Sequence, residues 1–363
     1  MEKIKLTDIC NPKQWKTIPT SELLENGYPV YGANGIIGYY SEFNHKNPVI
    51  TVTCRGATCG TINITVPKSY VTGNAMCLDD MRSDIYMEYL YYCLKHYNFN
   101  NVISGSAQPQ ITRQGMEKIY VTIGSHNEQM DIVDKLKKVE NVIGLRKREL
   151  KQLDTLVKSR FAEMFGDPIR NPKGWKVVTI GDIVTEVRYG TSKPAVEGGK
   201  YPYLRMNNLT ADGHLDLNDL KYIDISDDEV EKCVVRKGDV LFNRTNSIDL
   251  VGKTAVFDLQ DDMVIAGYII RVRLNEKILP EVLSQYMNLE ALKDILRSMA
   301  KGAVNQANIN AQELQSIRVY VPDIELQKQF VEMKEQIDKS KLPEWINLAK
   351  KGFDLLHERI CIW

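Results

Sequence analysis

The chain contains an internal repeat at a separation of 198 residues, which constrains its fold more than any other feature. Residues 104–111 form a polar, Gln-rich turn that is followed by a short β-like segment and an amphipathic helix. The same succession returns from residue 302, where Gln306 matches Gln108 and Gln327 matches Gln129. Solenoid units are only roughly 20–50 residues long, so this period indicates a duplicated domain. Two similar domains on one chain are suited to two similar halves of one target.

Length and composition place broad limits on the protein. At 363 residues the chain is long enough for two or three domains. Its 47 Lys and Arg residues balance 47 Asp and Glu residues, so any nucleic-acid binding must come from residues clustered on one face or from a basic partner. No apolar run approaches the roughly 18 residues of a membrane span, and the start shows no signal region. We therefore expect a cytoplasmic protein without membrane contact.

A long helix is predicted over 127–166, because apolar residues alternate at spacings of four and three as in a heptad seam. The seam positions are Ile132, Leu136, Val139, Ile143, Leu150, Leu153 and Val157. A seam needs a partner, and in the second copy Phe330 and Ile337 occupy the positions of Ile132 and Val139. We predict that the two helices pack antiparallel as a coiled coil. The alternative is two independent amphipathic helices, each lying on its own domain.

The remaining segments, 1–126 and 167–323, are typical of an α+β (mixed α/β) fold with small mixed sheets and peripheral helices. The β-rich runs are 49–53, 60–66, 240–242, 254–257 and 264–274, and the helical stretches are 85–97 and 279–299. The predicted order is a globular domain (1–126), the central helix (127–166), a second globular domain (167–323) and a C-terminal helix (324–363).

The familiar catalytic motifs are not present in the sequence. Residues 252–254 read Gly-Lys-Thr, but position 247 is Ser where a P-loop requires Gly. The carboxylates and lysine of residues 323–328 have the wrong spacing for a nuclease metal site, and the five histidines are scattered singly. The sequence therefore favours recognition over catalysis, although an enzyme whose site is not evident stays a third alternative.

The seven cysteines follow no metal-binding pattern, since none forms a Cys-x-x-Cys pair. Cys54, Cys59 and Cys77 could be arranged as a zinc site, but we favour buried free thiols. We accordingly expect no metal in this chain.

Several turns carry the side chains that read base edges, because Arg pairs with guanine and Asn or Gln with adenine. The candidates for DNA contact in the first domain are Asn34, Arg55, Thr58, Asn74, Ser106, Gln108 and Gln110. Those in the second domain are Arg205, Asn207, Asn208, Arg244, Thr245, Asn246, Lys253, Asn305, Gln306 and Asn308. Such clusters also occur in ordinary turns, where Asn, Gly and Ser satisfy the backbone. Their recurrence in both copies favours contacts.

At these residues the chain resembles the specificity subunits of type I restriction–modification systems over nearly its whole length. The resemblance rests on Tyr28-Pro29-Val30-Tyr31-Gly32-Ala33-Asn34-Gly35, Arg55-Gly56-Ala57-Thr58-Cys59-Gly60, Phe161-Ala162-Glu163-Met164-Phe165-Gly166-Asp167-Pro168, Tyr203-Leu204-Arg205, Gly238-Asp239-Val240-Leu241-Phe242-Asn243-Arg244-Thr245-Asn246 and Leu250-Val251-Gly252-Lys253-Thr254. It implies two target-recognition domains, each reading one half of a bipartite site on double-stranded DNA, with antiparallel helices as the spacer.

The resemblance also implies the partners of the chain. Two modification subunits would bring S-adenosylmethionine and adenine methylation, and two restriction subunits would bring ATP- and Mg-dependent translocation and cleavage. The chain itself would be non-catalytic and hold none of these cofactors. The pattern departs from the family after Lys341, where residues 342–345 replace a long charged helix, so the C-terminal helix is atypical beyond 341. The alternative function is a silent or scaffold-only copy that binds partner subunits without productive DNA reading.

Overall fold

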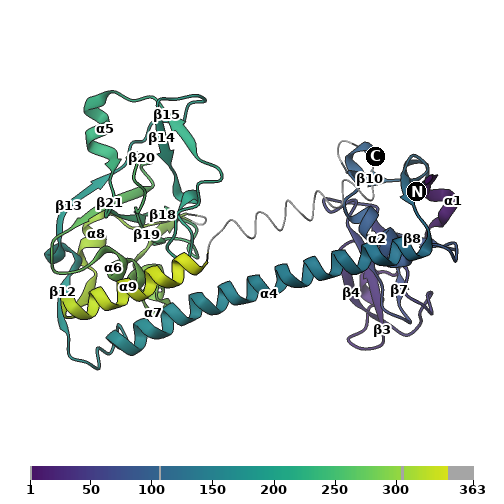
Figure 1. Cartoon of the computed structure of the whole chain (residues 1–363), viewed down its shortest axis with the longest axis horizontal. Coiled ribbons are helices and arrows are strands. Elements are labelled where there is room, and N and C mark those ends of the chain that lie inside the picture. The colour runs from purple at the N-terminus through teal and green to yellow at the C-terminus, as the bar shows by residue number, and fades with distance from the viewer. Residues whose placement is uncertain (1, 106–107, 304–305, 342–363) are drawn as a thin grey trace. The chain divides into compact units, whose positions relative to one another are not determined.

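The computed structural model describes residues 2–105, 108–303 and 306–341 (Figure 1). The chain divides into two compact units, of which the first runs to Lys147 and the second begins at Arg148. This division falls inside the helix α4 (His126–Phe165), so each unit contains part of that helix. The helix predicted over 127–166 is thus present, and it ends at Gly166, whose φ of +86° is the left-handed conformation that favours glycine at a helix end.

The first unit combines mostly antiparallel sheets, in which only β3 and β7 pair parallel among the described strands, with a few short helices. Its strands are β1 (Glu2–Lys5), β2 (Asn11–Gln14), β3 (Tyr28–Gly32), β4 (Gly35–Tyr40), β5 (Ile50–Thr53), β6 (Ile62–Ile64), β7 (Tyr70–Val71), β8 (Ala75–Asp79), β9 (Ile103–Ser104), β10 (Gln110–Ile111) and β11 (Tyr120–Ile123). Its helical elements are α1 (Leu6–Ile9), η1 (Thr20–Glu22), α2 (Met87–Lys95), η2 (Phe99–Asn101) and α3 (Arg113–Met116).

The main sheet of the first unit has the order β2-β8-β5-β6. Strand β2 lies at the sheet edge, where Pro12 is tolerated although it has no N–H to donate. A second sheet has the order β4-β3-β7. The core forms where β5, β8, α2 and the start of α4 meet, and it includes the buried side chains of Val52, Leu78, Leu90 and Leu136.

The second unit repeats the plan with larger sheets. Its strands are β12 (Lys176–Thr179), β13 (Val184–Tyr189), β14 (Tyr201–Leu204), β15 (Lys221–Ile223), β16 (Val234–Val235), β17 (Val240–Asn243), β18 (Thr245–Asn246), β19 (Thr254–Val256), β20 (Met263–Ile265), β21 (Ile269–Leu274), β22 (Lys301–Ala303), β23 (Gln306–Asn308) and β24 (Arg318–Val321). Its helical elements besides α4 are η3 (Ile180–Ile183), η4 (Met206–Asn208), α5 (Asp227–Cys233), α6 (Pro280–Met287), α7 (Glu290–Met299), α8 (Ala311–Ser316) and α9 (Ile324–Ser340). Two four-stranded sheets, β13-β21-β17-β19 and β15-β14-β20-β16, dominate it.

The sequence repeat corresponds to repeated structure. In the first unit β1 pairs antiparallel with β11, directly before α4, and in the second unit β12 pairs antiparallel with β24, directly before α9. The segments after β1 and β12 both form a helical turn, and α3 and α8 precede β11 and β24 in the same way. The predicted mixed fold with two similar units is therefore confirmed.

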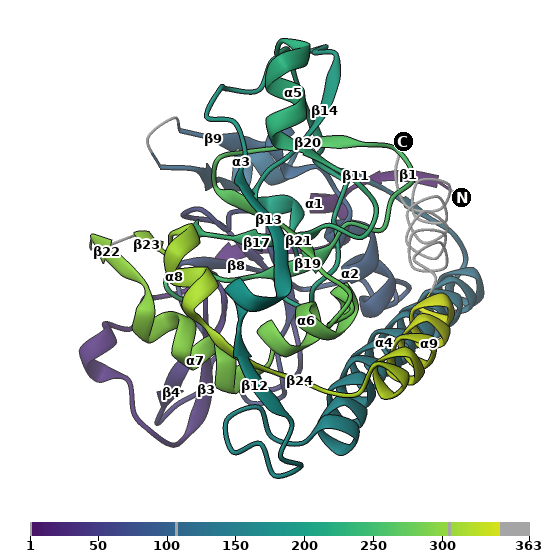
Figure 2. The same cartoon turned by 90° about the vertical axis from the view of Figure 1, so that its left-hand side faces the viewer.

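Helices α4 and α9 pack antiparallel within the second unit, where both views show them side by side (Figures 1 and 2). The Phe330 ring of α9 lies 5.3 Å from that of Phe161 and 5.5 Å from that of Phe165. Further along α9, the Lys341 ammonium forms an ion pair of 2.8 Å with Asp154. The later residue of α9 thus contacts the earlier residue of α4, so the two helices run in opposite directions.

The residues of the predicted heptad seam differ in their burial along the length of α4. Ile132 and Leu136 are buried in the core of the first unit and Val139 packs against it, as the alternative of helices lying on their own domains predicts. The middle positions, Ile143, Leu150 and Leu153, are half-buried. Val157 is buried in the core of the second unit together with Phe330, and Ile337 packs against the same core. Antiparallel packing is thus confirmed over the C-terminal part of α4. The expected helix beyond 341 lies outside the described residues.

Two predicted elements are each broken in two. The strand expected over 264–274 is interrupted at Gly267, where a tight turn brings the Ile269 N–H to the Ala266 carbonyl at 2.8 Å. The helix expected over 279–299 is interrupted at Asn288, whose side chain donates to the Thr254 carbonyl at 2.6 Å and accepts from the Thr254 N–H at 3.3 Å. The first break is a local turn, and the second coincides with hydrogen bonds to a segment distant in sequence, which local periodicity does not predict. No helix within the described ranges is long and apolar enough to cross a membrane.

Candidate nucleic-acid interface

In the first unit, the backbone around Arg55 brings four candidate turns together. The Thr53 hydroxyl donates to the Ala33 carbonyl, beside Asn34. The Cys54 N–H donates to the Asn74 carbonyl at 3.1 Å, and the Cys54 carbonyl accepts from the Ile111 N–H at 3.0 Å. Arg55 itself forms a β-bridge with Gln110. Segments up to 77 residues apart in sequence (34 to 111) therefore meet at one place.

The candidate side chains at this place face solvent. Asn34, Arg55, Gln108 and Gln110 are exposed, and Thr58 and Asn74 are half-buried. Ser106 lies outside the described residues. Exposed Arg, Asn and Gln side chains on a shared backbone platform are the groups that direct base readout requires.

The second unit contains the corresponding arrangement. Strand β18 pairs antiparallel with β23, which places Thr245 opposite Asn308. The Ile309 N–H donates to the Arg244 carbonyl at 2.9 Å, as Ile111 does to Cys54 in the first unit. Gln306 is exposed, whereas Asn246 and Asn308 are half-buried. Asn305 lies outside the described residues.

A cleft of about 600 Å³ opens in the second unit between three of the candidate residues. Arg205, Asn207 and Arg244 line it together with Lys193 and Tyr268. Its described lining includes no Asp or Glu, so the cleft itself is cationic. The lining comes from the start of η4, the residue between β17 and β18, the segment after β13 and the turn between β20 and β21.

The two arginines of the cleft keep part of their hydrogen-bonding capacity unused. The Arg244 guanidinium lies 5.0 Å from the centre of the Tyr189 ring and makes a long hydrogen bond of 3.5 Å to the Gly267 carbonyl. The Arg205 Nη2 donates to the Asp219 side chain at 2.7 Å and to its carbonyl at 3.0 Å. The Nε atoms of both arginines are buried and have no partner among the described residues. Among the described residues none forms an ion pair with Arg244, whereas Arg205 is paired with Asp219.

Two carboxylates, those of Asp219 and Glu229, orient the basic side chains of Arg205 and Lys193. Hydrogen bonds from Lys221 and Arg205 lower the pKa of Asp219. Hydrogen bonds from Lys193 and Thr191 lower the pKa of Glu229, and the Lys193 ammonium lies 2.5 Å from that carboxylate. The basic side chains of the cleft are therefore oriented before any ligand binds.

Three sequence-predicted contact residues are instead part of the protein interior. The Lys253 ammonium is buried and donates to the carbonyls of Leu209 and Met206, the latter at 2.8 Å. Asn208 donates to the Asp216 carbonyl at 2.8 Å and accepts from the Arg205 N–H at 2.8 Å. The Thr245 side chain is also buried. Lys253 and Asn208 shape the loop that presents Arg205, which corrects their prediction as direct contacts.

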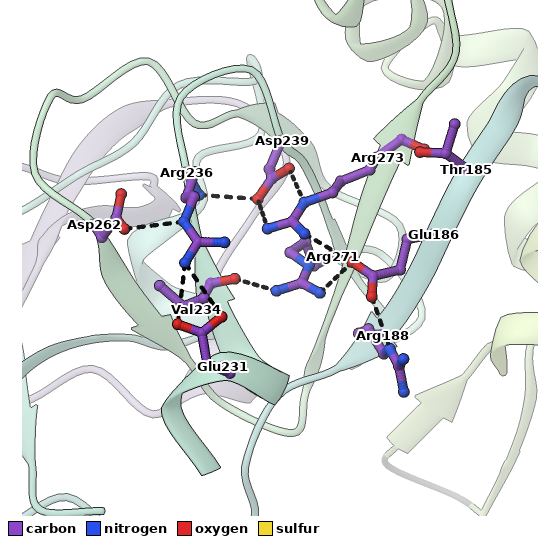
Figure 3. A network of polar contacts seen from close by, with 10 residues as sticks. All are labelled: Thr185, Glu186, Arg188, Glu231, Val234, Arg236, Asp239, Asp262, Arg271 and Arg273. Atoms are coloured by element: carbon purple, nitrogen blue, oxygen red, sulfur yellow. Dashed lines mark hydrogen bonds and ion pairs between the residues drawn. The ribbon is translucent and has the colours of Figure 1, made fainter. Parts of the chain in front are cut away.

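A polar network in the second unit joins the two large sheets (Figure 3). The Arg271 side chain, which is 1% exposed, leaves β21 and donates to the Val234 carbonyl of β16 and to Glu186 of β13 at 2.6 Å. Arg273 donates to the same carboxylate at 2.9 Å and to Asp239 at 2.9 Å. Burial alone would raise the pKa of Glu186, but the neighbouring arginines lower it, so the carboxylate is ionised.

This network fixes the two strands that border the cleft. Strand β13 ends at Tyr189, beneath the Arg244 guanidinium, and β21 begins directly after Tyr268. Sequence reasoning missed Lys193 and Tyr268 as cleft residues, and it missed Tyr189 as the ring beneath Arg244. The only available signal was their position beside Gly190, Thr191 and Gly267, where the chain turns between strands.

Comparison with known proteins identifies the family. The sequence pattern described as the type I restriction modification DNA specificity domain matches residues 1–155 and 172–347. The chain belongs to this family. The resemblance inferred from the motifs is thereby confirmed, and the two matched segments correspond to the two copies of the repeat.

Individual relatives support the assignment. The chain is 31% identical over 190 residues to the putative type I restriction enzyme MjaX specificity subunit of Methanocaldococcus jannaschii, an alignment that covers 50% of this chain and 44% of that protein. It is 25% identical over 273 residues to the EcoKI specificity subunit of Escherichia coli strain K12, covering 70% of this chain and 59% of that protein. The alignments thus span about half the length of these relatives.

Solved structures share the fold. The S subunit of a type I restriction-modification system from M. genitalium aligns with a TM-score of 0.58 at 14% identity, over 98% of this chain and 95% of that chain. A second structure, described in connection with assembly of the type I R-M system, aligns with a TM-score of 0.56 at 18% identity, over 99% and 96% of the two chains.

Proposed function

We propose that this chain is a non-catalytic subunit that reads a bipartite target on double-stranded DNA, with one half-site for each unit. The observation that carries the proposal is the repeated platform, in which an Arg-containing turn is bridged to the Gln- or Asn-rich turn of the repeat. Arg55 pairs with Gln110 in the first unit, and Thr245 beside Arg244 pairs with Asn308 in the second. Two equivalent readers on one chain fit two half-sites on one duplex.

The cleft of the second unit suits this role chemically. Arg205 and Arg244 line the cleft, and the terminal N–H groups of a guanidinium match guanine O6 and N7 or a phosphate oxygen. The ring of Tyr189 below Arg244 limits the motion of the guanidinium, so less conformational entropy is lost on binding. Lys193 is placed to contact a phosphate, which positions the protein on DNA without specifying sequence.

We further propose that α4 and α9 form the scaffold for two modification subunits, and that two restriction subunits complete the complex. S-adenosylmethionine, ATP and Mg would be bound by those partners, and the complex would work in the cytoplasm. The antiparallel packing of α9 on α4 supports a structural role for these helices, because the rings of Phe161, Phe165 and Phe330 lock them together.

The test is selection of bound sequences from a pool of randomised duplex DNA by the full chain purified with its modification subunits. We expect two specified blocks separated by an unread spacer of constant length. Specificity in one block only would contradict the bipartite reading. Partner binding without any selected sequence would establish the scaffold-only alternative. Methylation by the chain alone with S-adenosylmethionine would overturn the non-catalytic assignment.

A further inference from the structure

Three metal-ligating side chains meet in the first unit, away from the platform around Arg55. Cys77 and Asp79 lie two residues apart on β8, so they point to the same face of the sheet. His45 reaches them from a loop that is held by a β-bridge to Ser69. One ligand atom from each of the three residues lies within 4.8 Å of the others.

The tautomer of His45 follows from its neighbour. The Asn44 amide is oriented by the backbone of Val71, because its Nδ2 donates to the Val71 carbonyl at 3.0 Å and its Oδ1 accepts from the Val71 N–H at 2.9 Å. This Oδ1 lies 2.7 Å from His45 Nδ1, so Nδ1 must carry a proton. In a neutral imidazole the lone pair is then on Nε2, which faces the other two ligands.

The lone pair of His45 Nε2 faces a carboxylate oxygen, which is also a hydrogen-bond acceptor. His45 Nε2 lies 3.0 Å from Asp79 Oδ1. The other carboxylate oxygen, Oδ2, accepts from the Trp15 indole N–H at 3.0 Å, which holds Asp79 in this orientation. Two acceptors this close require a positive charge on or between them.

The third ligand completes the arrangement. The Cys77 side chain is fully buried, and no hydrogen bond of its thiol is found in the part of the chain that the structure describes. Lys13, its partner in the register of β2 and β8, has its ammonium 4.0 Å from the centre of the Trp15 ring. Burial raises the pKa of the Cys77 thiol, so a metal ion that binds its sulfur must displace the thiol proton.

We propose that His45, Cys77 and Asp79 bind a zinc ion, with a water molecule as the fourth ligand. Nitrogen, thiolate and carboxylate are the ligands that zinc prefers, and a mixed set of this kind disfavours magnesium and calcium. Asn44 is the outer partner that fixes the ring of a metal-bound histidine, and Trp15 fills this role for Asp79. The ion would tie the loop around His45 to β8. This proposal replaces the sequence-based expectation that the chain holds no metal.

The competing arrangement is a protonated His45 that forms an ion pair with Asp79 and binds no metal. Metal content of the full-length chain distinguishes the two. After removal of metal with a chelator and readdition of Zn²⁺, we expect about one zinc ion per chain after gel filtration. Titration with Co²⁺ should produce the thiolate-to-cobalt charge-transfer band and the visible bands of a tetrahedral site.

Variants assign the ligands. Cys77→Ser and Asp79→Asn should each lower the affinity for Zn²⁺ at least tenfold, and Cys77→Ser should abolish the charge-transfer band. Asp79→Asn keeps an acceptor for the Trp15 indole, so it is the variant expected to fold normally if Cys77→Ser does not. Cys233→Ser removes a buried thiol of the second unit and should leave binding unchanged. Absence of stoichiometric zinc, or zinc binding that both ligand variants retain, would overturn the proposal.

Discussion

Gln129 and Gln327, which are 198 residues apart, make the same three hydrogen bonds in the two units. Gln129 accepts from the Tyr86 N–H at 2.7 Å and donates to the carbonyls of Asp84 and Gly124, each at 3.0 Å. Gln327 accepts from the Leu279 N–H at 2.8 Å and donates to the carbonyls of Lys277 and Pro322 at 3.0 and 2.8 Å.

Both glutamines are buried, and each links the first turn of a long helix to the start of a shorter one. Gln129 lies in the first turn of α4 and reaches Tyr86, the N-cap residue of α2, whereas Gln327 lies in α9 and reaches Leu279, the N-cap residue of α6. The repeat therefore preserves these hydrogen bonds between two helices as well as the amino-acid pattern.

Replacing Gln327 by Leu should destabilise the second unit by about 2–4 kcal/mol, because it leaves one backbone N–H and two carbonyls without partners in the interior. Urea unfolding followed by circular dichroism measures the loss. Gln312, which is exposed, supplies the control, and Gln312→Leu should change the unfolding free energy by less than about 0.5 kcal/mol. Equal effects of both substitutions would show that the hydrogen bonds of Gln327 contribute nothing to the free energy of unfolding.

Phe330→Ala should cost about 3–5 kcal/mol, since it removes a fully buried ring that contacts both Phe161 and Phe165. Phe330→Leu retains most of the apolar volume and should cost less than about 1.5 kcal/mol. Thermal unfolding monitored at the helical signal compares the two variants. If they unfold at the same temperature, the rings do not hold α9 on α4.

Glu186→Ala should destabilise the second unit by roughly 3–5 kcal/mol, because it leaves the buried Arg271 guanidinium without its carboxylate. The double variant Glu186→Ala with Arg271→Met should recover most of this loss, since an apolar side chain then replaces the unpaired charge. Denaturant unfolding of the wild type, Glu186→Ala, Arg271→Met and the double variant forms a complete cycle. Additive losses would mean that the two residues do not interact.

Lys293 should make the stability of the second unit rise with pH. Burial lowers its pKa from 10.5 to about 8, and its ammonium donates to the Gly252 carbonyl and to Asn288. Between these pKa values the unfolded chain binds more protons than the folded chain, so the free energy of unfolding increases with pH. The destabilisation is complete below about pH 8 and disappears as the pH approaches the unfolded value.

The matched variant for this prediction is Lys293→Met. The wild type should gain on the order of 3 kcal/mol relative to Lys293→Met between pH 7 and pH 10.5. Unfolding in urea at a series of pH values measures the difference between the two proteins, in which the titration of other groups cancels. Parallel pH profiles would show that the Lys293 ammonium is not buried in the folded protein.

Arg244→Ala should relax base preference at one position of one half-site, at a cost of about 1–3 kcal/mol for a lost bidentate contact. Lys193→Ala should instead weaken binding to all sequences equally and reduce the salt dependence of binding. Competition binding with single-base variants of the selected target, at two salt concentrations, separates the two effects. An unchanged preference in Arg244→Ala would remove this residue from the set that reads bases.

The fold was largely predictable from the sequence where its signals are local or repeated. The heptad pattern and the Gly-Asp-Pro terminator located α4 to within one residue at each end, and the repeat predicted that a second helix begins at Ile324. Strand runs such as 50–53 and 240–243 were also found because their β-branched and apolar residues are contiguous.

The cleft was predictable only in part, because it combines side chains from four separate segments. Arg205 and Arg244 were identified by residue type, but Tyr268 lines the cleft, and Tyr189 lies beneath Arg244, only because β13 pairs with β21. Lys253 was assigned wrongly for a related reason. Its sequence environment resembles a surface turn, and nothing in it shows that carbonyls 44 and 47 residues away will surround the ammonium.

The platforms at Arg55 and Thr245 are held to the repeat turns by main-chain atoms, with Ile111 and Ile309 supplying the N–H groups. A backbone bridge forms with almost any side chain at the bridged position. A single-codon change at residue 55, 110 or 308 can thus alter the chemistry presented to a ligand without disturbing the surrounding architecture. Under the proposed function, a change of specificity in one unit then needs no compensating mutation in the other.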